Sequence, residues 1–254
     1  MRLSACIEWQ FLEAGEALPD RLRAAHAAGF DKVEFHLWRD KDMDGIAAAM
    51  ADTGVSLTGF CVDPRRSIVD PAERDEMLAA VADTLKVAKK VGSPPLIVAS
   101  GFRVESMSEQ EHFDNAVAAL RKAANLAEEA GVTLVLEPLN TELFATMYLV
   151  DTKLGLDLVE AVGSPRLQLL YDAYHSRVMG EDIREVLKGR THLVEHVQVA
   201  SWPGRNQPGL GDFDYADFIT ALDELGYTGP IGLEYFPTAD AEKSLAMSRE
   251  ALGV

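Results

Sequence analysis

Short apolar, β-rich runs alternate with longer amphipathic runs along the whole 254-residue chain. This alternation predicts repeated strand–helix units and a parallel sheet. The expected strands cover residues 3–8, 32–36, 56–62, 95–100, 132–137, 167–172, 192–200 and 230–236. Several of the amphipathic segments between them end at a glycine, which suits the left-handed conformation of a helix C-cap. Eight units without a low-complexity linker predict an α/β fold, a single-domain (β/α)8 TIM barrel over residues 1–254, rather than an open doubly wound sheet.

Composition and charge narrow the classes of function. The chain is 48% hydrophobic and 26% charged, enough for a sizeable core, and no apolar run approaches the roughly 20 residues of a membrane helix. The first residues lack the pattern of a secretory signal, so we expect a cytoplasmic protein with no membrane partner. The formal charge of -17 repels polyanions and argues against nucleic acid as a partner. Cys6 and Cys61 lie in apolar runs and are expected to be buried thiols.

Four oxygen-bearing side chains stand at the ends of the last four expected strands. They are Glu137, Asp172, Gln198 and Glu234, about one strand–helix unit apart. Because strand ends converge on one mouth in such barrels, these side chains could close around one cation. Three carboxylates and an amide oxygen favour Mg²⁺ or Mn²⁺ over Zn²⁺. Such an ion could polarise a hydroxy-carbonyl compound and stabilise the enediolate formed by proton loss.

Proton transfer and substrate binding need further groups. Glu137 and Glu234 come from strands three units apart, so they could approach a substrate from opposite sides as acid and base. His175 lies just beyond the sixth strand, where it could hydrogen-bond a substrate oxygen. Arg205 lies in a glycine- and proline-rich segment at the expected mouth, where its guanidinium could hold a carboxylate or an enediolate oxygen.

Other polar residues on the strands could reach the same pocket. Strand alternation places His196 on the face of Gln198, one layer deeper. Glu34 and His36 share a face of the second strand, and Glu8 ends the first. For these last three residues, structural roles are the favoured alternative.

The chain resembles the hydroxypyruvate isomerase family, within the sugar phosphate isomerase/epimerase-like barrels that also include the ketose 3-epimerases. The resemblance spans essentially the whole sequence. It is most specific in LEPLN (136–140), YDAYH (171–175), HVQVA (196–200), PGLGDFDY (208–215) and LEY (233–235).

The resemblance implies specific roles for these residues. It implies a (β/α)8 barrel with one divalent ion, and its ligands would be Glu137, Asp172, Gln198 and Glu234. Glu137 and Glu234 would also carry the acid–base chemistry, and His175 and Arg205 match substrate-contacting positions. Homodimers and homotetramers are common among such proteins.

The substrate class follows from position 198. Ketose 3-epimerases usually have histidine there, whereas hydroxypyruvate isomerase-like members have glutamine, as this chain does. The expected substrate is therefore a small, anionic hydroxy-keto acid, isomerised to its aldehyde form. The segment after the third strand, CVDPRRSIVDP, lacks the longer glycine-rich insertion of hydroxypyruvate isomerases proper. Its Arg65 and Arg66 could contact an anion or lie in a solvated turn.

Three other functions remain as alternatives. A ketose 3-epimerase shares the enediolate and differs in where the proton returns. A non-catalytic barrel could bind a sugar acid without turnover. An endonuclease IV-like nuclease would need a zinc cluster with many histidines, and both the charge of -17 and the total of six histidines count against it.

Overall fold

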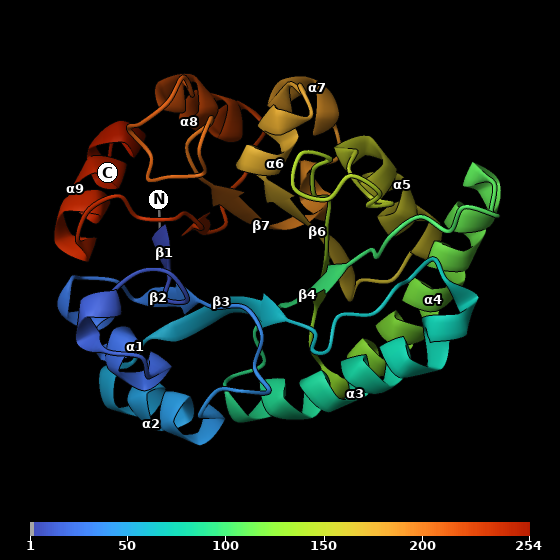
Figure 1. Ribbon diagram of the computed structural model, residues 1–254, viewed down its shortest axis with the longest axis horizontal. Helices are drawn as coiled ribbons and strands as arrows, with labels where there is room; N and C mark the ends of the chain where they lie inside the picture. Colours follow the sequence, from blue (N-terminus) through green and yellow to red (C-terminus); the bar gives the residue numbers. More distant parts are fainter. Residues whose placement is uncertain (1–2) are drawn as a thin grey trace.

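The strands close into a barrel that the helices surround (Figure 1). The computed structural model describes residues 3–254. All neighbouring strands pair in parallel in chain order, and Leu3 of β1 pairs with Ile231 of β8 to complete the ring. The strands are β1 (Leu3–Cys6), β2 (Lys32–Glu34), β3 (Ser56–Cys61), β4 (Leu96–Ala99), β5 (Leu134–Glu137), β6 (Leu167–Asp172), β7 (Val194–Val199) and β8 (Ile231–Leu233). The predicted (β/α)8 barrel is confirmed.

The helices form the outer layer and bury their apolar faces against the barrel. They are α1 (Leu18–Ala27), α2 (Met43–Thr53), α3 (Arg74–Lys90), α4 (Glu109–Ala130), α5 (Thr152–Val162), α6 (Ala173–Val178), α7 (Ile183–Val186), α8 (Tyr215–Glu224) and α9 (Ala241–Leu252). Short 3-10 turns cover Leu12–Ala14, Pro71–Glu73 and Thr191–Leu193.

Local sequence signals account for where several helices begin and end. The Ser108 side chain accepts a hydrogen bond from the backbone of Glu111, and the Glu111 side chain bonds back, which makes a capping box for α4. Gly131 ends the same helix with φ 73°, and Gly54 ends α2 with φ 76°. These left-handed caps confirm the expectation for these segment-ending glycines.

Several strands are shorter than the sequence pattern predicts. The chain turns after Cys6, where the backbone N–H groups of Trp9 and Gln10 both donate to the Cys6 carbonyl, so Glu8 lies beyond β1. The backbone N–H of His36 donates to the Glu8 carboxylate at 3.2 Å, which leaves His36 beyond the end of β2. Both residues consequently belong to loops at the mouth.

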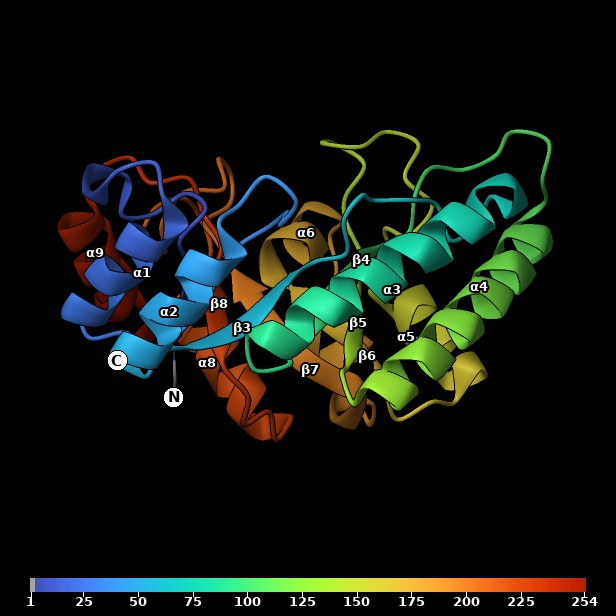
Figure 2. The same ribbon diagram turned by 90° about the horizontal axis from the view of Figure 1, so that it is seen from below.

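The barrel interior is filled in layers. Cys61, Ile97, Val135 and Leu170 form a small apolar cluster inside the ring, and both Cys61 and Cys6 are buried free thiols, as expected. Loops that follow β4 and β5 project from one side of the barrel, and the C-terminus lies toward the other (Figure 2). Within residues 3–254, no helix has the length and apolarity needed to cross a membrane.

Candidate functional site

The four predicted ligands lie together at the carboxyl-terminal mouth. Glu137 is the last residue of β5, Asp172 is the last of β6, and Glu234 directly follows β8. Gln198 of β7 pairs in register with Asp172 on one side and with Gly232 on the other. Parallel pairing therefore carries these side chains to one rim, as the spacing predicts.

A short helix that the sequence did not reveal brings His175 to this rim. The Asp172 carboxylate accepts a bond from the backbone of Tyr174 at 2.8 Å and so caps α6, which begins at the next residue. His175 Nε2 lies 3.4 Å from the other oxygen of Asp172 and 3.9 Å from Glu137. Glu137, Asp172 and His175 each offer a ligand atom within 4.8 Å of the others.

The orientation of His175 is fixed by Asn140. Asn140 Oδ1 accepts a hydrogen bond from the backbone of Leu143 at 2.9 Å, so its amide nitrogen points to His175 Nδ1 at 2.7 Å. Burial and the nearby Arg205 lower the pKa of His175 to about 3, so the ring is neutral with its proton on Nε2. This tautomer presents a hydrogen-bond donor to the mouth and suits the predicted substrate contact better than a metal-ligand role.

Arg205 reaches the same carboxylates from the loop after β7. A single nitrogen, Nη2, lies 2.5 Å from Glu234 Oε2 and 3.4 Å from Asp172 Oδ2. The residue has φ 53°, a left-handed conformation that is uncommon outside glycine and that clusters at functional sites. Its guanidinium also lies over the rings of Trp9 and Tyr174, 5.3 and 5.1 Å from their centroids.

The predicted acid–base pair has opposite pKa shifts. Burial raises the pKa of Glu137 well above its usual value, and the charges of Glu234 and Asp172 raise it further. Burial also disfavours the charge on Glu234, but Arg205 and a hydrogen bond from His36 outweigh it and lower that pKa. Two carboxyl groups with diverging pKa values suit an acid and a base.

A second hydrogen-bond network, inside the barrel, holds the amide of Gln198. Gln198 Nε2 donates to Glu34 Oε1 at 2.8 Å, and His196 Nε2 donates to Glu34 Oε2 at 2.7 Å. Thr58 donates to the same carboxylate at 3.0 Å. The shared inward face of His196 and Gln198 is thus confirmed, and Glu34 contacts both residues across the barrel.

This network leaves one buried oxygen of the site without a partner. Gln198 Oε1 accepts no hydrogen bond from any residue the structure describes, although Gln198 is only 2% exposed. A buried acceptor without a donor is costly, and a cation would satisfy it. Burial also raises the pKa of Asp172 to about 7 despite Arg205. A positive ion beside this carboxyl group would stabilise its ionised form. The donor set therefore fits a hard divalent cation.

The remaining candidates lie around this centre. His36 donates to Glu234 at 2.7 Å, so it contacts the site directly. Glu8 instead pairs with Lys41 at 2.9 Å, a structural role. Arg66 pairs outward with Glu76, whereas Arg65 turns toward Cys61.

Sequence reasoning gave no role to Asn140, Trp9 or Tyr174. Asn140 and Tyr174 lie within the LEPLN and YDAYH motifs, and that was the only signal for them. Trp9 directly follows an apolar strand, which makes it look like a core residue.

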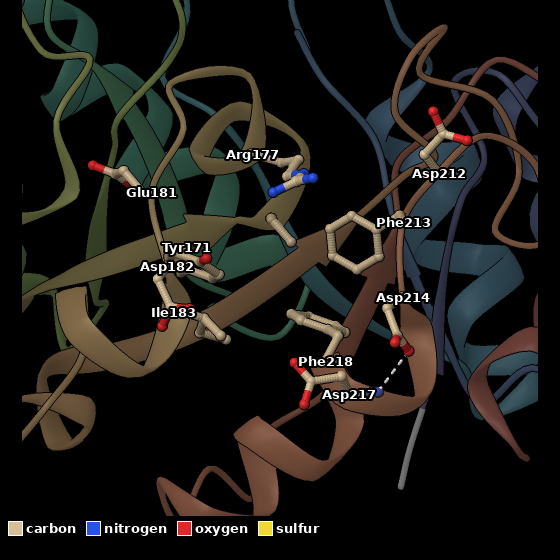
Figure 3. Close-up of a pocket in the computed structure, with 11 residues that line it drawn as sticks. Tyr171, Arg177, Glu181, Asp182, Ile183, Asp212, Phe213, Asp214, Asp217 and Phe218 are labelled. Carbon is tan, nitrogen blue, oxygen red and sulfur yellow. Dashed lines mark hydrogen bonds between the residues drawn. The ribbon is translucent and has the colours of Figure 1, made fainter.

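A cavity on the outer side of the barrel is separate from this centre (Figure 3). It lies between α6, α7 and the start of α8. Several of its carboxylates have structural partners: Asp214 accepts from the backbone of Asp217 to cap α8, and Asp217 pairs with Arg184. Glu181 accepts bonds from Thr152. These contacts stabilise the ends of α5 and α8.

Comparison with known proteins agrees with this fold. A sequence profile described as "Xylose isomerase-like TIM barrel" matches residues 22–251. The chain is 33% identical to a putative hydroxypyruvate isomerase of Streptomyces coelicolor, over 88% of this chain and 87% of that protein. It is 28% identical to a 2-oxo-tetronate isomerase of Cupriavidus necator, over 93% and 94% of the two chains.

Solved structures show the same architecture. The chain superposes on a protein described as AP endonuclease, family 2, from Brucella melitensis with a TM-score of 0.89, 28% identity and 96% coverage of both chains. A D-psicose 3-epimerase from Clostridium cellulolyticum, solved with D-tagatose, gives a TM-score of 0.82 at 21% identity over 99% of both chains. The second likeness concerns the fold alone.

Proposed function

The chain belongs to the xylose isomerase-like TIM barrel family, and on this premise we propose that it interconverts a small hydroxy-keto acid and its aldehyde isomer. Its relatives are isomerases, and the chain is an isomerase. The proposed substrates are hydroxypyruvate, which would give tartronate semialdehyde, or a close homologue such as a 2-oxo-tetronate.

We further propose that the site holds one Mg²⁺ or Mn²⁺ ion. Glu137, Asp172, Glu234 and the Oε1 atom of Gln198 would hold it. One observation carries this proposal. The amide nitrogen of Gln198 donates to Glu34, and its buried Oε1 atom lacks a hydrogen-bond donor among the described residues. When bound, the ion would act as a Lewis acid toward the substrate carbonyl and hydroxyl oxygens.

The proton transfers follow from the environments of the two glutamates. Glu234, whose pKa is lowered, is the carboxylate that takes the proton from C3 of hydroxypyruvate. Glu137, whose pKa is raised, returns a proton to C2, while the hydroxyl proton on O3 passes to O2, which leaves an aldehyde at C3 and a hydroxyl at C2. Proton exchange with solvent then restores both glutamates to their starting states. His175 Nε2–H and the Arg205 guanidinium stabilise the negative oxygens of the enediolate between these steps.

Glutamine variants test these roles. Glu137→Gln and Glu234→Gln should each lower turnover of hydroxypyruvate by about 100- to 10,000-fold, because an amide cannot exchange the proton. The matched control is Glu195→Gln, since Glu195 lies on β7 but is exposed on the face opposite Gln198. Turnover is followed by NMR in D2O, with circular dichroism to confirm the fold. Undiminished activity in both variants would overturn the assignment.

The same experiment separates the alternative functions. An isomerase introduces deuterium at C3 of hydroxypyruvate and at C2 of tartronate semialdehyde. Exchange confined to C3 and C4 of a free ketose, with none on hydroxypyruvate, would contradict the proposal and indicate a ketose 3-epimerase. Tight binding to duplex DNA at moderate salt would instead indicate a nuclease.

A further inference from the structure

Arg65 and Arg66 are consecutive, but their side chains have different partners. Arg66 Nε pairs with Glu76 at 2.7 Å, on the side of α3. Arg65 Nη2 instead lies 3.5 Å from Cys61 Sγ. Cys61 is the last residue of β3 and packs inside the barrel in the cluster with Ile97, so this contact places the Arg65 guanidinium at the β3–β4 side of the mouth.

Arg65 also differs from the other arginines of its cavity, and from Arg205, in lacking a carboxylate partner. Arg66 and Arg103 line the same cavity beside β4 and β5, and they pair with Glu76 and Glu109. Arg205 is committed to Asp172 and Glu234. Within residues 3–254, no carboxylate lies in ion-pair distance of Arg65. This is notable in a chain with 41 acidic and 24 basic residues.

The position of Arg65 makes it available to an entering anion. The residue is exposed to solvent, and its neighbours in the cavity include Ala99 and Leu139, which flank the ends of β4 and β5. A thiol is a weak acceptor for a guanidinium, whereas a carboxylate can accept two charge-assisted bonds. Partial desolvation disfavours the charge on Arg65, but its contact with Cys61 and, to a smaller extent, the charges of Glu137 and Glu234 outweigh this effect and raise its pKa.

We propose that Arg65 binds the carboxylate of the substrate and thereby selects acids over neutral ketoses. This inference rests on the proposed function, since it places the reacting carbons between Glu137 and Glu234. Arg205 differs from Arg65 because its Nη2 already pairs with Asp172 and Glu234, and the proposed function uses its guanidinium for the enediolate oxygens. Arg65 would position and select the substrate without moving a proton.

The test compares Arg65→Gln with its matched control Arg66→Gln. Loss of charge-assisted bonds should raise the KM for hydroxypyruvate by about 10- to 100-fold in Arg65→Gln. The kcat should change by less than about threefold, since Arg65 does not take part in the proton transfers. Arg66→Gln should retain wild-type KM, because Arg66 lines the same cavity but its guanidinium is already paired with Glu76 of α3.

A neutral competitor separates charge recognition from a general disturbance of the site. Dihydroxyacetone carries a hydroxymethyl group where hydroxypyruvate carries its carboxylate. Its inhibition constant as a competitive inhibitor should be the same in Arg65→Gln and the wild type. Arg65→Lys should recover part of the KM, because it restores the charge but not the planar fork. Thermal unfolding of each variant confirms that the fold is intact.

The outcomes distinguish this inference from the function on which it rests. If the wild-type protein does not turn over hydroxypyruvate or a 2-oxo-tetronate, the proposed function fails and the Arg65 assignment fails with it. If the wild type is active but Arg65→Gln has an unchanged KM, only the Arg65 assignment is refuted. An equal rise in the inhibition constant of dihydroxyacetone would also refute it. If dihydroxyacetone phosphate binds more tightly than hydroxypyruvate, the group that Arg65 binds would be a phosphate and not a carboxylate.

Discussion

Replacing Glu34 should weaken metal binding although Glu34 is not among the proposed ligands. Its carboxylate accepts the amide N–H of Gln198 at 2.8 Å and so fixes the opposite end of that amide, Oε1, toward the rim. In Glu34→Met, a side chain of similar length cannot accept this bond, and the amide is free to rotate. Loss of such a partner typically lowers metal affinity about 10- to 100-fold. Each tenfold loss corresponds to about 1.4 kcal/mol of binding free energy.

The same substitution should also destabilise the fold by a larger amount. It leaves Gln198 Nε2 and His196 Nε2 unpaired inside the barrel, at roughly 1–3 kcal/mol each, or roughly 2–6 kcal/mol together. Isothermal titration with Mn²⁺ measures the loss of metal affinity, and urea unfolding measures the loss of stability. Thr58→Val is the matched control, since it removes a different bond to Glu34 and should change the Mn²⁺ dissociation constant less than about threefold.

A double-mutant cycle decides whether the effect runs through Gln198. Glu34→Met should have little further effect on Mn²⁺ affinity in a protein that already carries Gln198→Met. An equal loss of affinity in both backgrounds would refute the reasoning, because the amide would then not transmit the change. Unaltered Mn²⁺ binding in Glu34→Met alone would refute it as well.

Two further predictions concern residues that position this site. Gly232→Ala should lower the free energy of unfolding, measured with urea, by roughly 1–3 kcal/mol. The reason is that the added Cβ would lie 2.6 Å from the Glu34 carboxylate. Gly59→Ala, whose nearest contact is 3.4 Å, should cost clearly less, and equal costs would contradict this explanation. Asn140→Leu should lower kcat/KM for hydroxypyruvate about tenfold or more, because His175 loses the donor that fixes its tautomer. An activity equal to that of wild type would show that Asn140 does not control the ring.

The sequence predicts the barrel and its rim because both depend on local patterns. Glu137 and Asp172 end strands where apolar runs give way to polar residues, and parallel pairing brings such ends together. The sequence could not show that Glu34 of β2 reaches Gln198 of β7, since that contact crosses the barrel interior and depends on closure. Sequence reasoning favoured a structural role for Glu34, and it could not identify the residue that Glu34 supports.

Short helices and the directions of side chains could also not be predicted from the sequence. Helix α6 has only six residues, too few for a visible helical period, and it depends on the cap from Asp172. The neutral state of His175 arises from burial and from Arg205, and its tautomer arises from Asn140, and spacing along the chain can show none of these. The opposite directions of Arg65 and Arg66 likewise depend on their partners Cys61 and Glu76.

Closure of the ring by β8 has a consequence for biosynthesis. Glu234 directly follows the last strand, and β8 pairs with β1, so the first and last strands must meet before Glu234 reaches the rim. A nascent chain that has emerged only as far as β7 already carries Glu137, Asp172 and Gln198, but it lacks Glu234. The site is therefore assembled only after β8 has been synthesised, and ligand binding would distinguish chains that include β8 from chains that stop before it.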